Sequence, residues 1–136
     1  MSTWNYSLEE VNSFPKLNYN FQLEIIKRHR DNDLKFKTTN EIVLQERSYA
    51  DIMAYTMLSM GSYNSYSKFI DEYWETCKAY QQQYACVIYL SGRQNCTPEN
   101  DNVRSINKHY AKCADLLIRH YINEFNENNN VLYVDT

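Results

Sequence analysis

Apolar residues recur at steps of three and four along most of the chain, the spacing that places them on one face of an α-helix. Four such stripes lie within residues 17–26, 42–60, 66–80 and 103–125. Polar and charged residues occupy the positions between them. The pattern therefore predicts a helical protein in which each stripe forms the buried face of one helix.

Capping residues indicate where these helices begin. Ser7 followed by Glu10 is a capping-box pattern and predicts a short helix before the first stripe. Residues 38–40, Thr-Thr-Asn, are candidate caps for the second stripe, and Gly61 ends it. Residues 97–98, Thr-Pro, combine a cap with a first-turn proline and predict a new helix start.

Residues 84–90, Tyr-Ala-Cys-Val-Ile-Tyr-Leu, form the most apolar run of the chain. Its length also suits a strand, but no partner strand is visible in the sequence. We therefore interpret the run as a helix that is buried on nearly all sides. The expected fold is an all-α single-domain helical bundle over residues 1–136, with this segment as its buried central helix.

Composition narrows the fold class further. The chain has 136 residues but only 2 Gly and 2 Pro, which disfavours turn-rich β-folds and glycine-rich phosphate loops. The net charge of −3 disfavours a nucleic-acid-binding surface. No apolar run has the length of a membrane span. The first ten residues lack the layout of a signal peptide, so we expect a cytosolic protein.

Tyrosine is the most abundant aromatic residue, with 13 copies. Its apolar ring and polar hydroxyl suit an interface as well as a core, so a tyrosine-rich helical domain is suited to binding another polypeptide. An AT-rich genome would enrich the same residue without functional meaning. Both explanations remain open from composition alone.

Cysteine spacing gives no metal motif. None of the four cysteines forms a C-x-x-C pair or has a histidine at zinc-ligand spacing, so we expect no metal and no cofactor. Cys77, Cys86 and Cys113 fall within apolar patterns and are expected to be buried. Cys96 lies in a polar segment, where an intermolecular disulfide is conceivable.

One spacing is compatible with catalysis. Arg104 and His109 match the Arg-x4-His pattern and resemble the site of HEPN ribonucleases, which are small all-helical domains. In that chemistry His acts as an acid or base and Arg stabilises developing charge on the phosphate. We prefer the interpretation that both are surface residues of the last helix. A helical ribonuclease, or a helical immunity or interaction protein, is the alternative function.

The end of the last stripe carries a family resemblance. Residues 119–131 resemble the homology 2 segment of the Bcl-2 family, in which a helix ends in an aromatic-aliphatic pair before a polar turn and Trp. Phe125 stands near the aromatic position, residues 128–130 replace the turn, and Val131 replaces the Trp. Residues 84–90 resemble the family's buried fifth helix.

Two family features are absent. Residues 80–83, Tyr-Gln-Gln-Gln, stand where the family has Asn-Trp-Gly-Arg, so Gln83 replaces the Arg that pairs with the ligand. The hydrophobic C-terminal tail is also missing. The chain is most similar to short, tail-less members found in large DNA viruses such as poxviruses and fish iridoviruses.

The resemblance implies a non-enzymatic, anti-apoptotic viral protein. It would hold the homology 3 helix of host Bim, Bak or Bax in a hydrophobic groove, in the host cytoplasm with recruitment to mitochondria but without a membrane anchor. A homodimer is left open, and no nucleic-acid partner is expected. The implied groove residues are Tyr49, Ile52, Met53, Thr56, Phe69, Ile70, Tyr73, Trp74, Tyr80, Gln83, Tyr84 and Val87.

Overall fold

The computed structural model describes residues 15–90, 108–127 and 130–134. Within these ranges it contains four α-helices, one 3₁₀ turn and two strands. In chain order they are α2 (Pro15–Lys35), α3 (Tyr49–Met60), η1 (Asn64–Tyr66), α4 (Ser67–Gln81), β1 (Val87–Leu90), α5 (Lys108–Phe125) and β2 (Val131–Val134). The expected helical bundle is confirmed, with a small sheet in addition.

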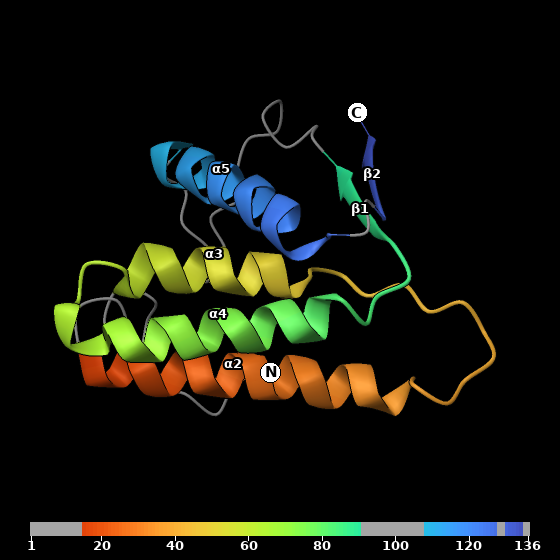
Figure 1. Ribbon diagram of the computed structural model, residues 1–136, viewed down its shortest axis with the longest axis horizontal. Helices are drawn as coiled ribbons and strands as arrows, with labels where there is room; N and C mark the ends of the chain where they lie inside the picture. The colour runs from red at the N-terminus through yellow and green to blue at the C-terminus, as the bar shows by residue number, and fades with distance from the viewer. Residues whose placement is uncertain (1–14, 91–107, 128–129, 135–136) are drawn as a thin grey trace.

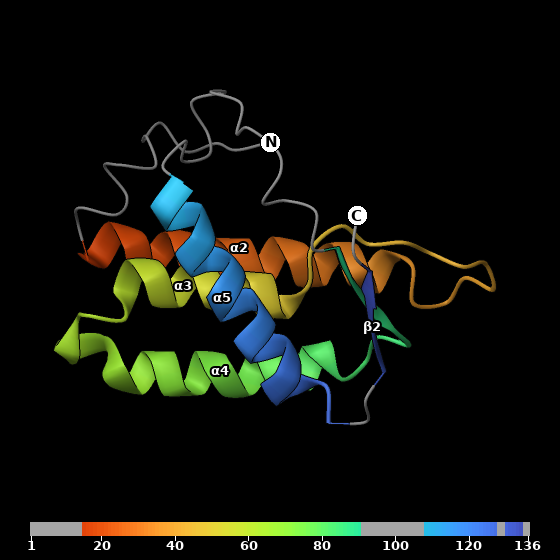
Figure 2. The ribbon, with the colours of Figure 1, turned by 90° about the horizontal axis from the view of Figure 1, so that it is seen from above.

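Helix α3 lies at the centre of the bundle. It packs against α2 and α4 on one side and against α5 on the other, as Figures 1 and 2 show. Seven of its 12 residues are buried, among them Tyr49, Met53 and Met60, which are fully enclosed. The buried central helix is therefore α3, a short helix with apolar or small residues on nearly every side.

The prediction of a central helix over residues 84–90 is wrong, because part of this run is strand β1. Val87 and Tyr89 are buried, whereas Ile88 and Leu90 are exposed, which is the two-residue alternation of a strand. β-branched and aromatic residues favour this conformation once a partner strand is present. That partner, β2, comes from the far end of the described chain, which the local pattern does not reveal.

The two strands run parallel. Val87 lies opposite Val131, and the Val87 N–H donates to the Asn130 carbonyl over 2.9 Å. The inner face of the sheet turns toward α5, where the Tyr89 hydroxyl donates to the Asp115 carboxylate. An isolated two-stranded sheet is marginally stable in water, so this packing against α5 stabilises it.

The second stripe was expected to be helical from residue 42, but α3 begins only at Tyr49. Ser48 caps it, because the Ser48 Oγ accepts from the Ala50 N–H while the Asp51 carboxylate accepts from the Ser48 N–H. Ile42 lies in the preceding loop and is 94% exposed. The capping box at Ser48 sets the boundary, and the apolar residues before it are not part of the core.

Of the other helix boundaries, some can be compared with the structure and some cannot. α2 begins at Pro15, the first-turn position that proline prefers, and α4 covers the aromatic stripe as expected. The predicted helix at Ser7 and the predicted starts at residues 97–98 and 103 lie outside the described residues.

The cysteine prediction is correct only for Cys77, which is buried. Cys86 and Cys113 are exposed, so their expected burial is wrong. Cys86 lies between α4 and β1, outside any helix, so helical spacing does not predict whether it is buried. Cys113 lies beside the buried face of α5, which includes Ala114 instead. Cys96 lies outside the described residues.

Polar residues form part of the core between α2 and α3. The Gln22 amide donates to Asn18 over 3.0 Å and to Ser59 over 3.2 Å, and it accepts from Thr56 over 2.8 Å. The Tyr73 hydroxyl of α4 donates to the Gln22 carbonyl. Among the described residues, no buried side-chain N or O atom lacks a hydrogen-bond partner. The polar layer is therefore fully matched and fixes how the three helices meet.

Candidate partner-binding surface

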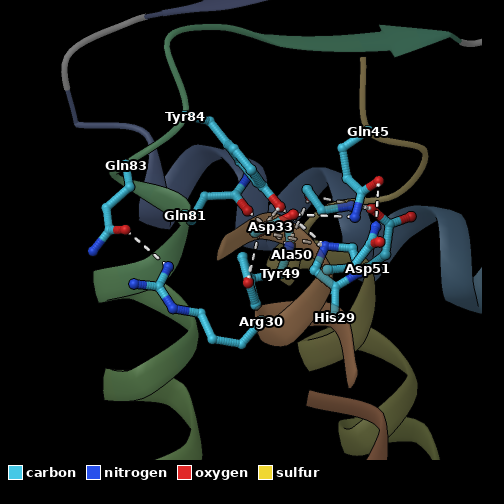
Figure 3. A network of polar contacts seen from close by, with 12 residues as sticks. His29, Arg30, Asp33, Gln45, Tyr49, Ala50, Asp51, Gln81, Gln83 and Tyr84 are labelled. Carbon is cyan, nitrogen blue, oxygen red and sulfur yellow. Dashed lines mark hydrogen bonds and ion pairs between the residues drawn. The ribbon is translucent and has the colours of Figure 1, made fainter. Parts of the chain in front are cut away.

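Asp33, near the end of α2, is the centre of a polar cluster (Figure 3). One carboxylate oxygen accepts from the hydroxyls of Tyr49 and Tyr84, each over 2.7 Å. The other oxygen accepts from the Gln45 amide over 3.0 Å. Asn32 donates to Gln45 and orients that amide. One carboxylate thus connects α2, the loop before α3, α3 itself and the segment that enters β1.

His29 extends the cluster. Its Nε2 lies 3.0 Å from the Tyr84 hydroxyl and 4.0 Å from the Asp33 carboxylate. The Tyr84 hydroxyl donates its one proton to Asp33, so it accepts from His29, whose Nε2 then carries a hydrogen. Burial lowers the pKa of His29, against the opposing effect of the Asp33 and Asp51 carboxylates. Burial and the Asp33 contact raise the pKa of Tyr49 and of Tyr84.

Gln81, the last residue of α4, joins this cluster to the sheet. Its side-chain oxygen Oε1 accepts from the Tyr49 backbone N–H over 2.8 Å, and its side-chain nitrogen Nε2 donates to the Asn126 side-chain oxygen over 3.3 Å. Asn126 donates to Asn130, which donates to the Tyr84 carbonyl. These bonds hold Asn126 and Asn130 beside the end of α4 and the segment that enters β1. Within the described residues, each buried side-chain N and O atom of this network has a hydrogen-bond partner, so the network stabilises the contact between these elements.

Arg30 lies at the edge of this network, half-buried. Its Nη1 donates to the Gln83 amide oxygen over 2.8 Å, and its guanidinium lies 4.2 Å from the centre of the Tyr80 ring. It also acts on the Tyr49 hydroxyl, whose pKa it lowers against the effect of burial. An open hollow of about 320 Å³ adjoins it between α2 and α4, lined by Ile26, Lys27, Arg30, Asp31, Thr76 and Tyr80.

Exposed apolar side chains gather at one end of the molecule. Within the described residues, every large apolar side chain that is exposed lies at this end, except Leu23 and Leu116. They belong to the end of α2, the loop before α3, and the two strands, which share one end of the molecule in Figures 1 and 2. They are Leu34, Phe36, Ile42, Val43, Leu44, Ile88, Leu90, Leu132 and Tyr133, and we call this surface the apolar end.

The residues expected to line a ligand groove are mostly packed against one another. Tyr49, Ile52, Met53, Thr56, Tyr73 and Val87 are buried; Phe69, Ile70, Trp74, Tyr80 and Tyr84 are half-buried; Gln83 is exposed. The Tyr49 ring contacts the rings of Tyr80 and Tyr84 at centroid distances of 5.2 and 5.7 Å. Most of these side chains meet in the core that α3 and α4 share. A ligand helix would enter there only if the two helices parted.

The alternative catalytic pair is not assembled in the described residues. His109 is exposed in the first turn of α5, and Arg104 lies outside the described part of the chain. The Arg104–His109 site therefore stays a prediction, which cleavage of RNA by wild type but not by a His109→Ala variant would support.

Sequence reasoning missed the Asp33 cluster. Residues 27–33 are all charged or polar and have the composition of a solvated helix end, yet the side chains of His29 and Asp33 are each only 13% exposed. One signal was present: both continue the buried stripe of Asn18, Gln22 and Ile26 at helical steps. The partners that bury them, Tyr49 and Tyr84, come from other elements and leave no local sign.

Comparison with models of known protein families, with curated proteins and with solved structures finds no match to this chain. None of the described helices is long and apolar enough to cross a membrane. The described residues also contain no cluster of three or more His, Cys, Asp or Glu that could hold a metal ion. The function of the protein is therefore inferred from the apolar end.

Proposed function

We propose that this protein acts by binding another polypeptide, and that the apolar end is its docking surface. The observation that carries the proposal is the concentration of exposed apolar side chains there, including Ile42 at 94% and Leu44 at 84% exposure. Exposed large apolar side chains that are grouped on one part of a protein are typical of sites where a partner binds.

The partner we propose is an amphipathic helix. Ile88 and Leu132, which lie opposite each other in the sheet, and Leu90 are exposed, and so are Ile42 and Leu44 in the loop before α3. The apolar face of a helix, with side chains at steps of three and four, complements a surface of this kind. No catalytic step is part of the proposal.

The resemblance to the Bcl-2 family leads to a second proposal, which names a more specific partner. In it the protein is anti-apoptotic and binds the homology 3 helix of Bim, Bak or Bax in the host cytoplasm. One observation favours it: α5 ends at Phe125, where the resemblance places the aromatic end of the homology 2 helix. Most residues of the expected groove are buried and cannot contact a ligand as the protein stands. The apolar end is therefore the surface to test.

Titration of the full chain with a Bim homology 3 peptide and with unrelated amphipathic helices tests both proposals. Leu44→Glu should weaken binding at least about tenfold, because a carboxylate would enter the apolar contact unpaired. Leu116→Glu is the matched control, since Leu116 is 56% exposed on α5, outside the apolar end. It should leave affinity unchanged.

Each outcome is informative. Binding of several amphipathic helices, but not preferentially of the homology 3 peptide, would support the general proposal and reject the anti-apoptotic one. No binding of any helix, or equal effects of Leu44→Glu and Leu116→Glu, would reject the apolar end as the docking surface.

A further inference from the structure

Strand β2 has a neighbouring strand on one side only. The sheet has two strands among the described residues, so the edge of β2 that faces away from β1 is open (Figure 1). None of the 4 residues of β2 is buried, whereas Val87 and Tyr89 of β1 are. Leu132 and Tyr133 belong to opposite faces of the sheet, yet both are exposed. The core therefore covers β2 less than it covers β1.

The open edge presents backbone groups for hydrogen bonds. The parallel pairing with β1 uses the N–H and C=O groups of Leu132 and Val134. Those of Val131 and Tyr133 face the other way, where no backbone bond is present among the described residues. Such an edge is a template for a further strand, and proteins often block it with a charged residue or a proline. The strand Val131–Val134 contains neither.

These backbone groups are complementary to their own copies. In an antiparallel pair, two residues that lie opposite each other can exchange both of their N–H···O bonds. When β2 of a second copy runs antiparallel along the open edge, Val131 of each copy exchanges bonds with Tyr133 of the other. The two-fold axis then passes at Leu132. The outward N–H and C=O groups of both residues are satisfied in both copies by one symmetric contact.

The side chains favour the edge of β2 over that of β1. At the edge of β2, the residue on the axis is Leu132, which is exposed and meets its own copy in an apolar pair without any charge. The same construction at the edge of β1 places Tyr89 on the axis. Tyr89 is buried, and its hydroxyl donates to Asp115 of α5, so α5 occupies the side on which the two rings would meet.

We propose that the protein forms a two-fold symmetric dimer in which β2 pairs antiparallel with β2 of a second copy, so that the two sheets become one. A two-stranded sheet is marginally stable, and further strands stabilise it. A contact confined to one strand of 4 residues is smaller than the about 800 Å² per partner of a stable interface, so we expect a reversible dimer. The inference goes beyond the proposed function, because it concerns the edge of the sheet and requires no helical ligand.

Sedimentation velocity of the full chain from about 10 μM to about 1 mM tests the dimer. Leu132→Glu should raise its dissociation constant at least about tenfold, because two carboxylates would face each other across the axis. Ile88→Glu is the matched control. Ile88 lies opposite Leu132 in β1 and is 53% exposed against 54%, but it is not on the pairing edge. It should leave the dissociation constant unchanged, and circular dichroism checks that both variants are folded.

Cysteine crosslinking tests the register. In the proposed pairing the two Leu132 Cα atoms are about 4.5 Å apart, within the range that a disulfide spans. Leu132→Cys should therefore form a 132–132 disulfide dimer under mild oxidation, which peptide mass mapping identifies. Tyr133→Cys should form no 133–133 bond, because Tyr133 lies opposite Val131 of the second copy. The native cysteines are the same in both variants.

Three results would overturn the inference. They are a monomer at every concentration, equal weakening of the dimer by Leu132→Glu and Ile88→Glu, and equal yields of the 132–132 and 133–133 disulfides. None of them bears on the docking of a helix, which is measured with peptides on the face of the apolar end.

Discussion

In the part of the chain that the structure describes, every buried side-chain N or O atom has a hydrogen-bond partner. Asn18, Thr56 and Gln81 are fully buried, and each has hydrogen-bond partners from another element. An unmatched buried polar group costs about 1–3 kcal/mol, whereas a matched one is close to neutral or favourable. Such residues contribute to specificity, since only one arrangement of the helices satisfies all of them.

His29 predicts a pH dependence of stability. Its pKa is lowered in the native state by burial, so the unfolded chain binds a proton more readily. Its contribution to stability is therefore complete above the unfolded pKa of about 6.5 and is lost as the pH falls toward the native pKa. Urea unfolding of wild type and His29→Gln between pH 7.5 and pH 5 should show the wild type losing more stability, by at most about 1.4 kcal/mol per pH unit.

The difference between the two proteins isolates His29, because His109 and His120 are present in both. Parallel pH profiles would mean that the Asp33 and Asp51 carboxylates cancel the effect of burial. A wild type that gains stability on acidification would mean that they exceed it.

Among the elements, β1 depends most on distant residues, because residues 87–90 form a strand through pairing with β2. Val87 donates its N–H to the Asn130 carbonyl. In the parallel pairing with β2, the neighbouring Ile88 turns its N–H to the outer side of β1, where no backbone bond is present among the described residues. In a helix both amides would donate to carbonyls four residues earlier.

Amide hydrogen exchange measured by NMR distinguishes the two structures. We expect the Val87 amide to exchange slowly and the Ile88 amide to exchange fast, in line with the strand pairing. The amide of Cys77, a buried residue in the middle of α4, serves as the protected reference. Equal, strong protection of Val87 and Ile88 would contradict the strand and favour the helix that the apolar run suggested.

At the scale of the whole molecule, the Asp33 carboxylate holds four segments at once. Asp33→Asn leaves a neutral amide whose single oxygen cannot accept from Tyr49, Tyr84 and Gln45 as the carboxylate does. We expect a loss of about 1.5–3 kcal/mol in the free energy of unfolding, the range for hydrogen bonds to a charged group. Far-UV circular dichroism and tryptophan fluorescence should shift together, because the segments share one core.

Asp31→Asn is the control for this substitution. Asp31 lies two residues earlier on α2 and is exposed, so its variant should stay within about 0.5 kcal/mol of wild type. A similar loss in both variants would point to the net charge of α2 as the cause. Separate transitions for the two probes would show that the Asp33 cluster stabilises only its own end of the molecule.

Predictions from the sequence were accurate where burial repeats along a single helix. The stripe of α4 was recognised because its buried positions, Tyr73, Cys77 and Gln81, follow helical steps and most are apolar or aromatic. The buried face of α2 was only partly recognised, because Asn18 and Gln22 look like surface residues. The groove residues were assigned from the resemblance to the Bcl-2 family, and their sequence pattern does not distinguish an open groove from a closed core.

The helical class of this protein, the extent of α4 and the stop near Gly61 follow from the order of its amino acids alone. These depend on hydrophobic periodicity and end signals, which act between residues a few positions apart. Three other features depend on the folded chain: β1 is a strand, α3 lies between the other helices, and Asp33 and Arg30 bond to Tyr84 and Gln83. Each of these depends on partners distant in sequence, and a polar or apolar residue carries no local mark of the partner that it will meet.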